Sequence, residues 1–149
     1  MLLQPRPFLD LPIHRCEGVY VVRRGARVPR GLRADLPILL GPGTQVAGSV
    51  EAFGAVTLAA RAAVLGDVRA EGDVVLGAGA SVGGSIRTTG NVVLQRGARV
   101  GGRVDAGGDV LVRPRVVVGD VTAGGDIRVA GPAETGSLRA GGRFVAVRA

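Results

Sequence analysis

The sequence predicts an all-β fold, a parallel β-helix of triangular cross-section built from about seven to eight coils of 18 residues. Three observations predict it. Apolar residues recur in columns spaced by 18, they fall in pairs two residues apart within each repeat, and glycines separate these pairs at regular intervals. One coil cannot bury its own apolar side, but stacked coils bury it in ladders of like side chains.

The repeat is read directly from consecutive segments. GDVRAEGDVVLGAGASVG from Gly66, GSIRTTGNVVLQRGARVG from Gly84 and GRVDAGGDVLVRPRVVVG from Gly102 follow one another without a gap, and two shortened coils begin at Asp120 and Ser137. We expect the apolar columns to form the core, for example Leu32, Val50, Val68, Ile86, Val104, Val121 and Leu138, or Tyr20, Ile38, Val56, Val74, Val92, Val110, Ile127 and Phe144.

The corners of the coils are expected at glycine and proline. The chain has 26 glycines, and one glycine column lies between the apolar pairs, where glycine supplies positive φ or another tight conformation. Its members are Gly54, Gly72, Gly90, Gly108, Gly125 and Gly142. Pro114 and Pro132 fall at another corner, where a missing N–H is tolerated.

Charge and cysteine content indicate in which compartment the protein works and which partners it could bind. The 19 basic residues are all arginine and give a net charge of +7. This charge is compatible with binding of nucleic acid or anionic lipid. The use of arginine in place of lysine is also what a GC-rich genome produces. We therefore predict no specific nucleic-acid partner. Cys16 is the one cysteine, which fits a reducing compartment, and Met1 to Leu11 lack the features of a signal peptide, so we expect a cytoplasmic protein.

Two columns are expected to point outward. One is charged and is interpreted as a solvated face: Arg33, Glu51, Arg69, Arg87, Asp105, Thr122 and Arg139. The other is mostly apolar and is called here the apolar strip: Val21, Leu39, Thr57, Val75, Val93, Leu111, Arg128 and Val145. Exposed apolar strips usually mark interaction surfaces, so Leu39, Val75, Val93 and Leu111 are candidates for a lateral contact between rods or for a contact with the chain's own N-terminal segment. A third interpretation is that such residues are simply tolerated on a flat sheet.

The two ends are the main candidate sites. A solenoid exposes unpaired strand edges at its first and last coils, and soluble repeat proteins normally cover them. The last coil ends within an apolar strand, with candidate contact residues Leu138, Phe144, Val145 and Val147. The first coil is also apolar, at Val19, Tyr20, Val21 and Val22. We expect both ends to be open and adhesive.

The domain prediction is a flexible tail over residues 1–13 and a rod over residues 14–149. Prolines in the tail exclude a useful helix. Its apolar side chains either enter a membrane, helped by Arg6, or pack on the rod: Leu2, Leu3, Phe8, Leu9 and Leu11.

GSIRTTGNVVLQRGARVG resembles the repeat of the bactofilins, a family of polymer-forming cytoskeletal proteins, and the resemblance covers roughly residues 14–149. It implies a right-handed β-helix that assembles end to end into filaments without a nucleotide or other cofactor. It also implies a polymer contact at Phe144 and a membrane-targeting tail, so the partners are copies of the chain, the anionic inner face of the cell membrane, and cell-envelope or division proteins. The short flanks and arginine-rich charge depart from the family.

Two alternatives come from other classes. Hexapeptide-repeat acyltransferases also repeat apolar residues every six, but they need a histidine base, and His14 is the one histidine here. The stretch from Ala123 to Gly142 resembles the C-terminal β-helix of MinC-type division inhibitors, which form dimers. We expect a scaffold without enzymatic activity, metal or cofactor.

Overall fold

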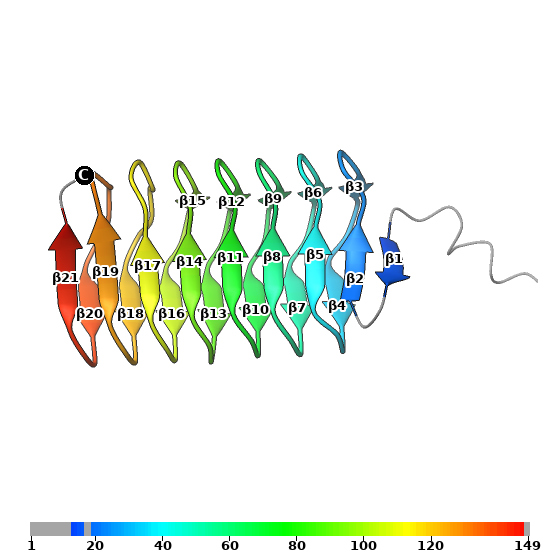
Figure 1. Ribbon diagram of the computed structural model, residues 1–149. Helices are drawn as coiled ribbons and strands as arrows, with labels where there is room; N and C mark the ends of the chain where they lie inside the picture. Colours follow the sequence, from blue (N-terminus) through cyan, green and yellow to red (C-terminus); the bar gives the residue numbers. More distant parts are fainter. Residues whose placement is uncertain (1–12, 17–18, 148–149) are drawn as a thin grey trace, which may run out of the picture.

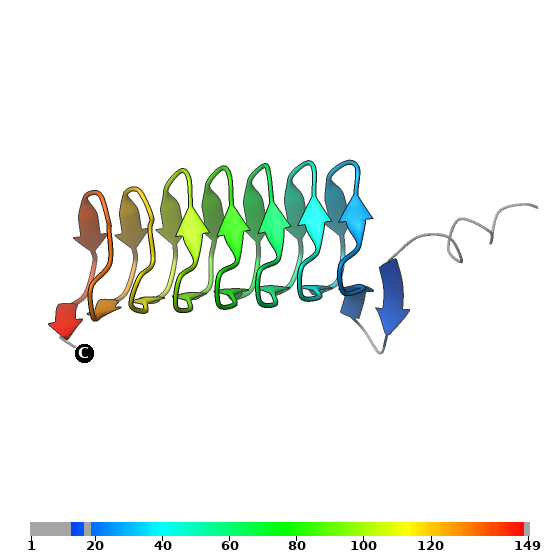
Figure 2. The same ribbon diagram turned by 90° about the horizontal axis from the view of Figure 1, so that it is seen from above.

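The structure, a computed structural model, describes residues 13–16 and 19–147 and consists of a single stack of coils (Figure 1). Its parallel ladders and regular 18-residue register confirm the predicted all-β parallel β-helix. Strands on the near side of Figure 1 point upward and the chain returns behind them while successive coils advance to the left, which makes the helix right-handed. Seen from above in Figure 2, the coils remain evenly stacked from one end to the other.

Sheet A, on the near side of Figure 1, contains nine strands within the described residues. In spatial order they are β1 (Ile13–Cys16), β2 (Val19–Val22), β5 (Ile38–Leu40), β8 (Val56–Leu58), β11 (Val74–Leu76), β14 (Val92–Leu94), β17 (Val110–Val112), β19 (Ile127–Ala130) and β21 (Phe144–Val147). From β2 to β21 all neighbours are parallel, whereas β1 runs antiparallel to β2.

Sheet C has seven parallel strands, which corresponds to seven complete coils. They are β4 (Leu32–Ala34), β7 (Val50–Ala52), β10 (Val68–Ala70), β13 (Ile86–Thr88), β16 (Val104–Ala106), β18 (Val121–Ala123) and β20 (Leu138–Ala140).

Sheet B is the shortest, with five two-residue strands: β3 (Arg27–Val28), β6 (Gln45–Val46), β9 (Ala63–Val64), β12 (Ser81–Val82) and β15 (Arg99–Val100). Beyond β15 it continues through single bridges, from Arg99 to Val117 and from Val117 to Glu134. The register changes at the neighbouring corner, where Gly101 and Gly102 of one coil are followed in the next coil by Gly119 alone. The shortened coils thus lose one residue where sheet B meets sheet C.

The predicted apolar columns form the core. Val74 lies beside Val92, which lies beside Val110, and all three are almost completely buried. Within the three-residue strands the outer two residues point inward and the middle one points out, as in the buried–intermediate–buried pattern of β11. Each coil therefore adds a layer of Val, Leu, Ile and Ala to one continuous core.

The glycine corners have two different physical causes. In the predicted column, glycine is needed because successive coils approach closely: a Cβ on Gly72 would lie 2.8 Å from the backbone nitrogen of Ala55. The left-handed backbone conformation occurs instead at the turns that follow sheet A, at Gly25, Gly43, Gly79, Gly97 and Gly131. Arg61 and Arg115 occupy this conformation with φ of 61° and 65°, which is costly for a residue with a Cβ.

Polar side chains form ladders along two corners, which the apolar columns did not predict. The Oδ1 atom of Asp73 accepts a hydrogen bond from the backbone N–H of Asn91 (2.9 Å), and Asn91 accepts one from Asp109 (2.7 Å). The ladder continues to Asp126 and Arg143. A second ladder at the corner before sheet C runs through Ser49, Asp67, Ser85 and Arg103. Each bond satisfies a corner N–H that faces the preceding coil.

Candidate assembly surfaces

At the C-terminal end, sheet A stops at an exposed apolar strand. β21 pairs with β19 on one side, with Phe144 beside Ile127, and no described strand pairs with its other edge. Ile127 is completely buried, whereas Phe144 is 51% exposed and Val145 is 36% exposed. Leu138 in β20 is half-buried, and of Val147 only the backbone is described. The end therefore presents both unpaired backbone groups and apolar side chains.

The N-terminal end differs from the expectation of an open edge. β1 pairs antiparallel with the whole of β2, with Ile13 opposite Val22 and Cys16 opposite Val19. Val22 is completely buried, and Val19, Tyr20 and Val21 are half-buried. The expectation fails in sheet A because only residues 17 and 18 separate these two strands in the sequence, which permits antiparallel pairing within a hairpin-length connection. Ile13, assigned to the tail, belongs to this added strand.

β1 restricts how a second copy can extend the rod. Continuation of the parallel ladder would bring an incoming strand against the outer edge of β2, and β1 occupies that edge in the opposite direction. In sheets B and C the first strands are β3 and β4, and no other described strand lies beyond them. Among the strands that the structure describes, the N-terminal end is thus covered in sheet A and uncovered in sheets B and C.

The apolar strip lies on the outer face of sheet A as expected. Val75 is in register with Val93, and Val93 with Leu111. These three residues and Leu39 are half-buried, because each is flanked by residues of the coils above and below. Leu2, Leu3, Phe8, Leu9 and Leu11, the candidates for a tail contact, lie outside the described residues.

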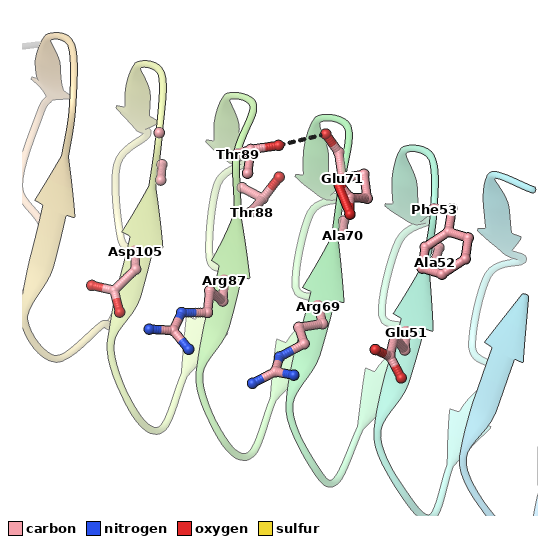
Figure 3. Close-up of a pocket in the computed structure, with 12 residues that line it drawn as sticks. Glu51, Ala52, Phe53, Arg69, Ala70, Glu71, Arg87, Thr88, Thr89 and Asp105 are labelled. Atoms are coloured by element: carbon pink, nitrogen blue, oxygen red, sulfur yellow. Dashed lines mark hydrogen bonds between the residues drawn. The ribbon is translucent and has the colours of Figure 1, made fainter. Parts of the chain in front are cut away.

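The charged column forms the outer face of sheet C and lines a shallow groove of about 340 Å³ (Figure 3). Arg69 and Arg87 lie on adjacent coils between Glu51 and Asp105. Glu51 also lies 3.5 Å from the Arg33 guanidinium, and both side chains are solvent-exposed enough for this pair to contribute little. No histidine or cysteine lines the groove, so its chemistry is that of a charged surface.

The one histidine of the sequence lies in the first strand of the rod. His14 lies in β1, opposite Val21 in the strand register. Within residues 13–16 and 19–147, no group of three or more His, Cys, Asp and Glu residues is placed to hold a metal ion. The same residues include no helix long and apolar enough to cross a membrane.

These features define the class of the molecule: a β-solenoid whose first coil is partly covered by an antiparallel strand and whose last strand of sheet A, β21, has no described neighbour on its outer edge. Comparison with known proteins adds no closer assignment, because no family model, no curated protein and no solved structure matches the chain.

Proposed function

We propose that this protein is a self-polymerising scaffold of the bactofilin type, which forms filaments in the cytoplasm through end-to-end contacts of its terminal coils and lies at the inner face of the cell membrane. The observation that supports it most directly is the exposed apolar strand β21 at the end of otherwise buried ladders. A β-solenoid is compatible with such a role, since unpaired strands at the ends of a stack are templates for further strands.

The free energy for this contact comes from two sources. Phe144 and Val145 lose water-exposed apolar surface when another coil covers them, and the free backbone groups of β21 gain hydrogen-bond partners. Stacked aliphatic ladders with backbone pairing resemble the contacts of other strand-based polymers. Nothing in this contact requires a nucleotide.

The covered edge of β2 makes the C-terminal coil the first contact in assembly. Two C-terminal coils can meet with their β21 strands antiparallel, and nothing within the described residues lies in the way. Contacts through the N-terminal coil use β3 and β4, or require β1 to leave β2. Longer filaments therefore depend on a second, weaker contact.

The same observation favours a second candidate, a dimeric regulator similar to MinC-type division inhibitors. If only the C-terminal coil associates, assembly stops at two rods. The size of the assembled species separates the two functions: a fixed dimer supports the regulator, and particles that lengthen with concentration support the scaffold.

The test is the substitution Phe144→Arg, with Phe53→Arg as its matched control. Both phenylalanines are exposed, at 51% and 60%, but Phe53 lies on the side of the rod and Phe144 at its end. A charge buried at the junction without a partner is strongly unfavourable, so Phe144→Arg should raise the concentration needed for assembly at least about tenfold. Electron microscopy and sedimentation velocity measure the outcome.

The control should assemble as the unsubstituted chain does. Filaments of normal length and concentration dependence in the Phe144→Arg variant would refute a C-terminal junction. A monomeric unsubstituted chain at high concentration would refute the scaffold altogether.

A further inference from the structure

One edge of the rod is formed by the turns that connect sheet A to sheet B, and it is called here the turn edge. It comprises residues 23–25, 41–43, 59–61, 77–79, 95–97, 113–115 and 131–133 and runs along the top of Figure 1. Successive turns are joined by backbone hydrogen bonds, for example from Gly43 N to Ala60 O (3.0 Å) and from Gly79 N to Arg96 O (3.0 Å). The turn edge is therefore straight and fixed.

Positive charge is concentrated on this edge. Its charged residues are all arginine, and every one is exposed: Arg23, Arg24, Arg61, Arg96, Arg113 and Arg115. Among the described residues no carboxylate lies within ion-pairing distance of these six, since the ion pairs found there involve Arg33 and Arg103. The six guanidinium groups are thus available to an outside partner.

The opposite edge carries the opposite charge. The turns that connect sheet C to sheet A, along the bottom of Figure 1, are residues 35–37, 53–55, 71–73, 89–91, 107–109, 124–126 and 141–143. The first six contain no arginine, and the last contains Arg143. The acidic residues of these turns are Asp35, Glu71, Asp73, Asp109 and Asp126. The separation of charge gives the rod one basic edge and one acidic edge, so a negatively charged surface would orient it.

Apolar residues lie within and beside the turn edge. Pro42, Ala60, Ala78 and Pro114 occupy the turns themselves. On one side lies the apolar strip of sheet A. On the other lies sheet B, whose groove of about 410 Å³ extends to the corner with sheet C, where Leu65 is 68% exposed.

We propose that the turn edge binds an anionic phospholipid surface, with the arginines at the headgroups and the acidic edge turned away. Basic side chains next to apolar ones are the composition of interfacial membrane-binding surfaces. Nucleic acid is the less favoured partner, because single strands are held largely by aromatic stacking and these turns contain no aromatic residue. The inference does not rest on polymerisation, since an isolated rod presents the same edge.

The geometry suits a flat surface. The arginines belong to the first, third, fifth and sixth coils, so at one strand spacing per coil they span about 24 Å along the rod. Each arginine close to an anionic membrane changes the partition constant about fivefold. Three arginines together should therefore change the partition constant about a hundredfold.

The experiment compares two triple variants of the full chain that have the same net charge. The first, Arg24→Gln, Arg96→Gln and Arg113→Gln, alters the turn edge. The second, Arg69→Gln, Arg87→Gln and Arg139→Gln, alters the outer face of sheet C. Both keep the tail and β21 intact, and both leave Arg61 and Arg115 in their left-handed conformation. Binding is measured by sedimentation with vesicles of phosphatidylcholine alone or mixed with phosphatidylglycerol.

We expect the turn-edge variant to lose about a hundredfold in affinity for anionic vesicles, the sheet C variant to lose less than about fivefold, and neither protein to bind phosphatidylcholine strongly. Equal loss in both variants would overturn the proposal in favour of net charge, and unchanged binding in both would assign membrane binding to the tail. A selective loss of duplex-DNA binding by the turn-edge variant, without an effect on vesicles, would also overturn it. Electron microscopy of the same variants reports polymerisation separately.

A fluorophore gives an independent readout of orientation. In a Cys16→Ser chain, an environment-sensitive label on Ala78→Cys should shift to shorter wavelength with anionic vesicles, because Ala78 lies on the turn edge. The same label on Thr89→Cys, at the acidic edge, should not shift. A shift at Thr89→Cys alone would contradict the proposed orientation.

Discussion

At the N-terminal end of sheet A, β2 pairs with β1 on its outer side and Val22 is completely buried; at the C-terminal end, β21 has no described neighbour on its outer side and Phe144 is 51% exposed. Both strands belong to the same parallel ladder and carry the same kinds of side chain. The difference comes from four residues, Ile13–Cys16, added in the antiparallel direction. At this end of sheet A, a change of strand direction therefore covers the edge that a further parallel coil would use.

The formation of the rod and the association of its ends place different requirements on the sequence. The columns that build the rod must be apolar at every coil, including the last. Whether an end then associates with another molecule depends on the residues that flank the terminal repeats. Here the C-terminal coil has the exposed strand and the N-terminal coil has the paired one, so we expect the two ends to differ in stability and in association.

The largest expected difference between the two ends is in the free energy of unfolding that is lost when a core valine is replaced. Val22 and Val129 occupy the same inward column at opposite ends of the rod, and only Val22 is completely buried. Val22→Ala should lower the free energy of unfolding by about 2–3 kcal/mol, through lost burial and a cavity, and Val129→Ala by about 1 kcal/mol. Urea denaturation measures both. Equal losses would show that the C-terminal coil is as well packed as the N-terminal one.

A smaller effect is expected from removal of β1. Deletion of residues 1–16 frees the outer edge of β2, so the concentration needed for assembly should fall about tenfold, equivalent to about 1.4 kcal/mol. Deletion of residues 1–12 is the control, because it leaves β1 in place. Light scattering against concentration distinguishes them. If both deletions behave alike, β1 does not limit assembly.

The smallest effect concerns the two strained arginines. Arg61→Gly and Arg115→Gly should each raise the free energy of unfolding by about 0.5–1 kcal/mol, because the relief of left-handed strain exceeds the added entropy of the unfolded glycine. Arg61 lies in the third coil and Arg115 in the sixth. Thermal and urea unfolding should give similar gains if both coils unfold with the whole rod, and a smaller gain at Arg115 if the C-terminal coils unfold first.

The fold was predictable because its main constraint is periodic. Residues such as Val74, Val92 and Val110 are repeated at fixed spacing, and only a stacked coil places such residues beside one another. The glycine columns were also visible in the sequence, but the physical reason for glycine at these positions was not. The sequence shows that Gly72 is fixed in the repeat, and only the structure shows that a side chain there would collide with Ala55.

The ends were less predictable because they break the period. The prediction of a tail up to residue 13 and an open first coil did not include the alternative that Ile13–Cys16 pairs antiparallel with Val19–Val22. The separation of these two segments by only two residues in the sequence was a signal for it. The polar ladder from Asp73 to Asp126 was also readable as a column of Asp and Asn. The grouping of arginines on one edge required knowledge of which turn connects which sheets.

The interchangeability of the inner coils has a consequence for how the molecule changes length. Because β8 through β16 contact only the coils before and after them, a duplication of two whole coils would lengthen the rod by about 10 Å while leaving both termini as they are. Gene duplication can thus set the distance between the two tips independently of their chemistry. The length of the rod is in this sense set by the number of repeats that the gene encodes.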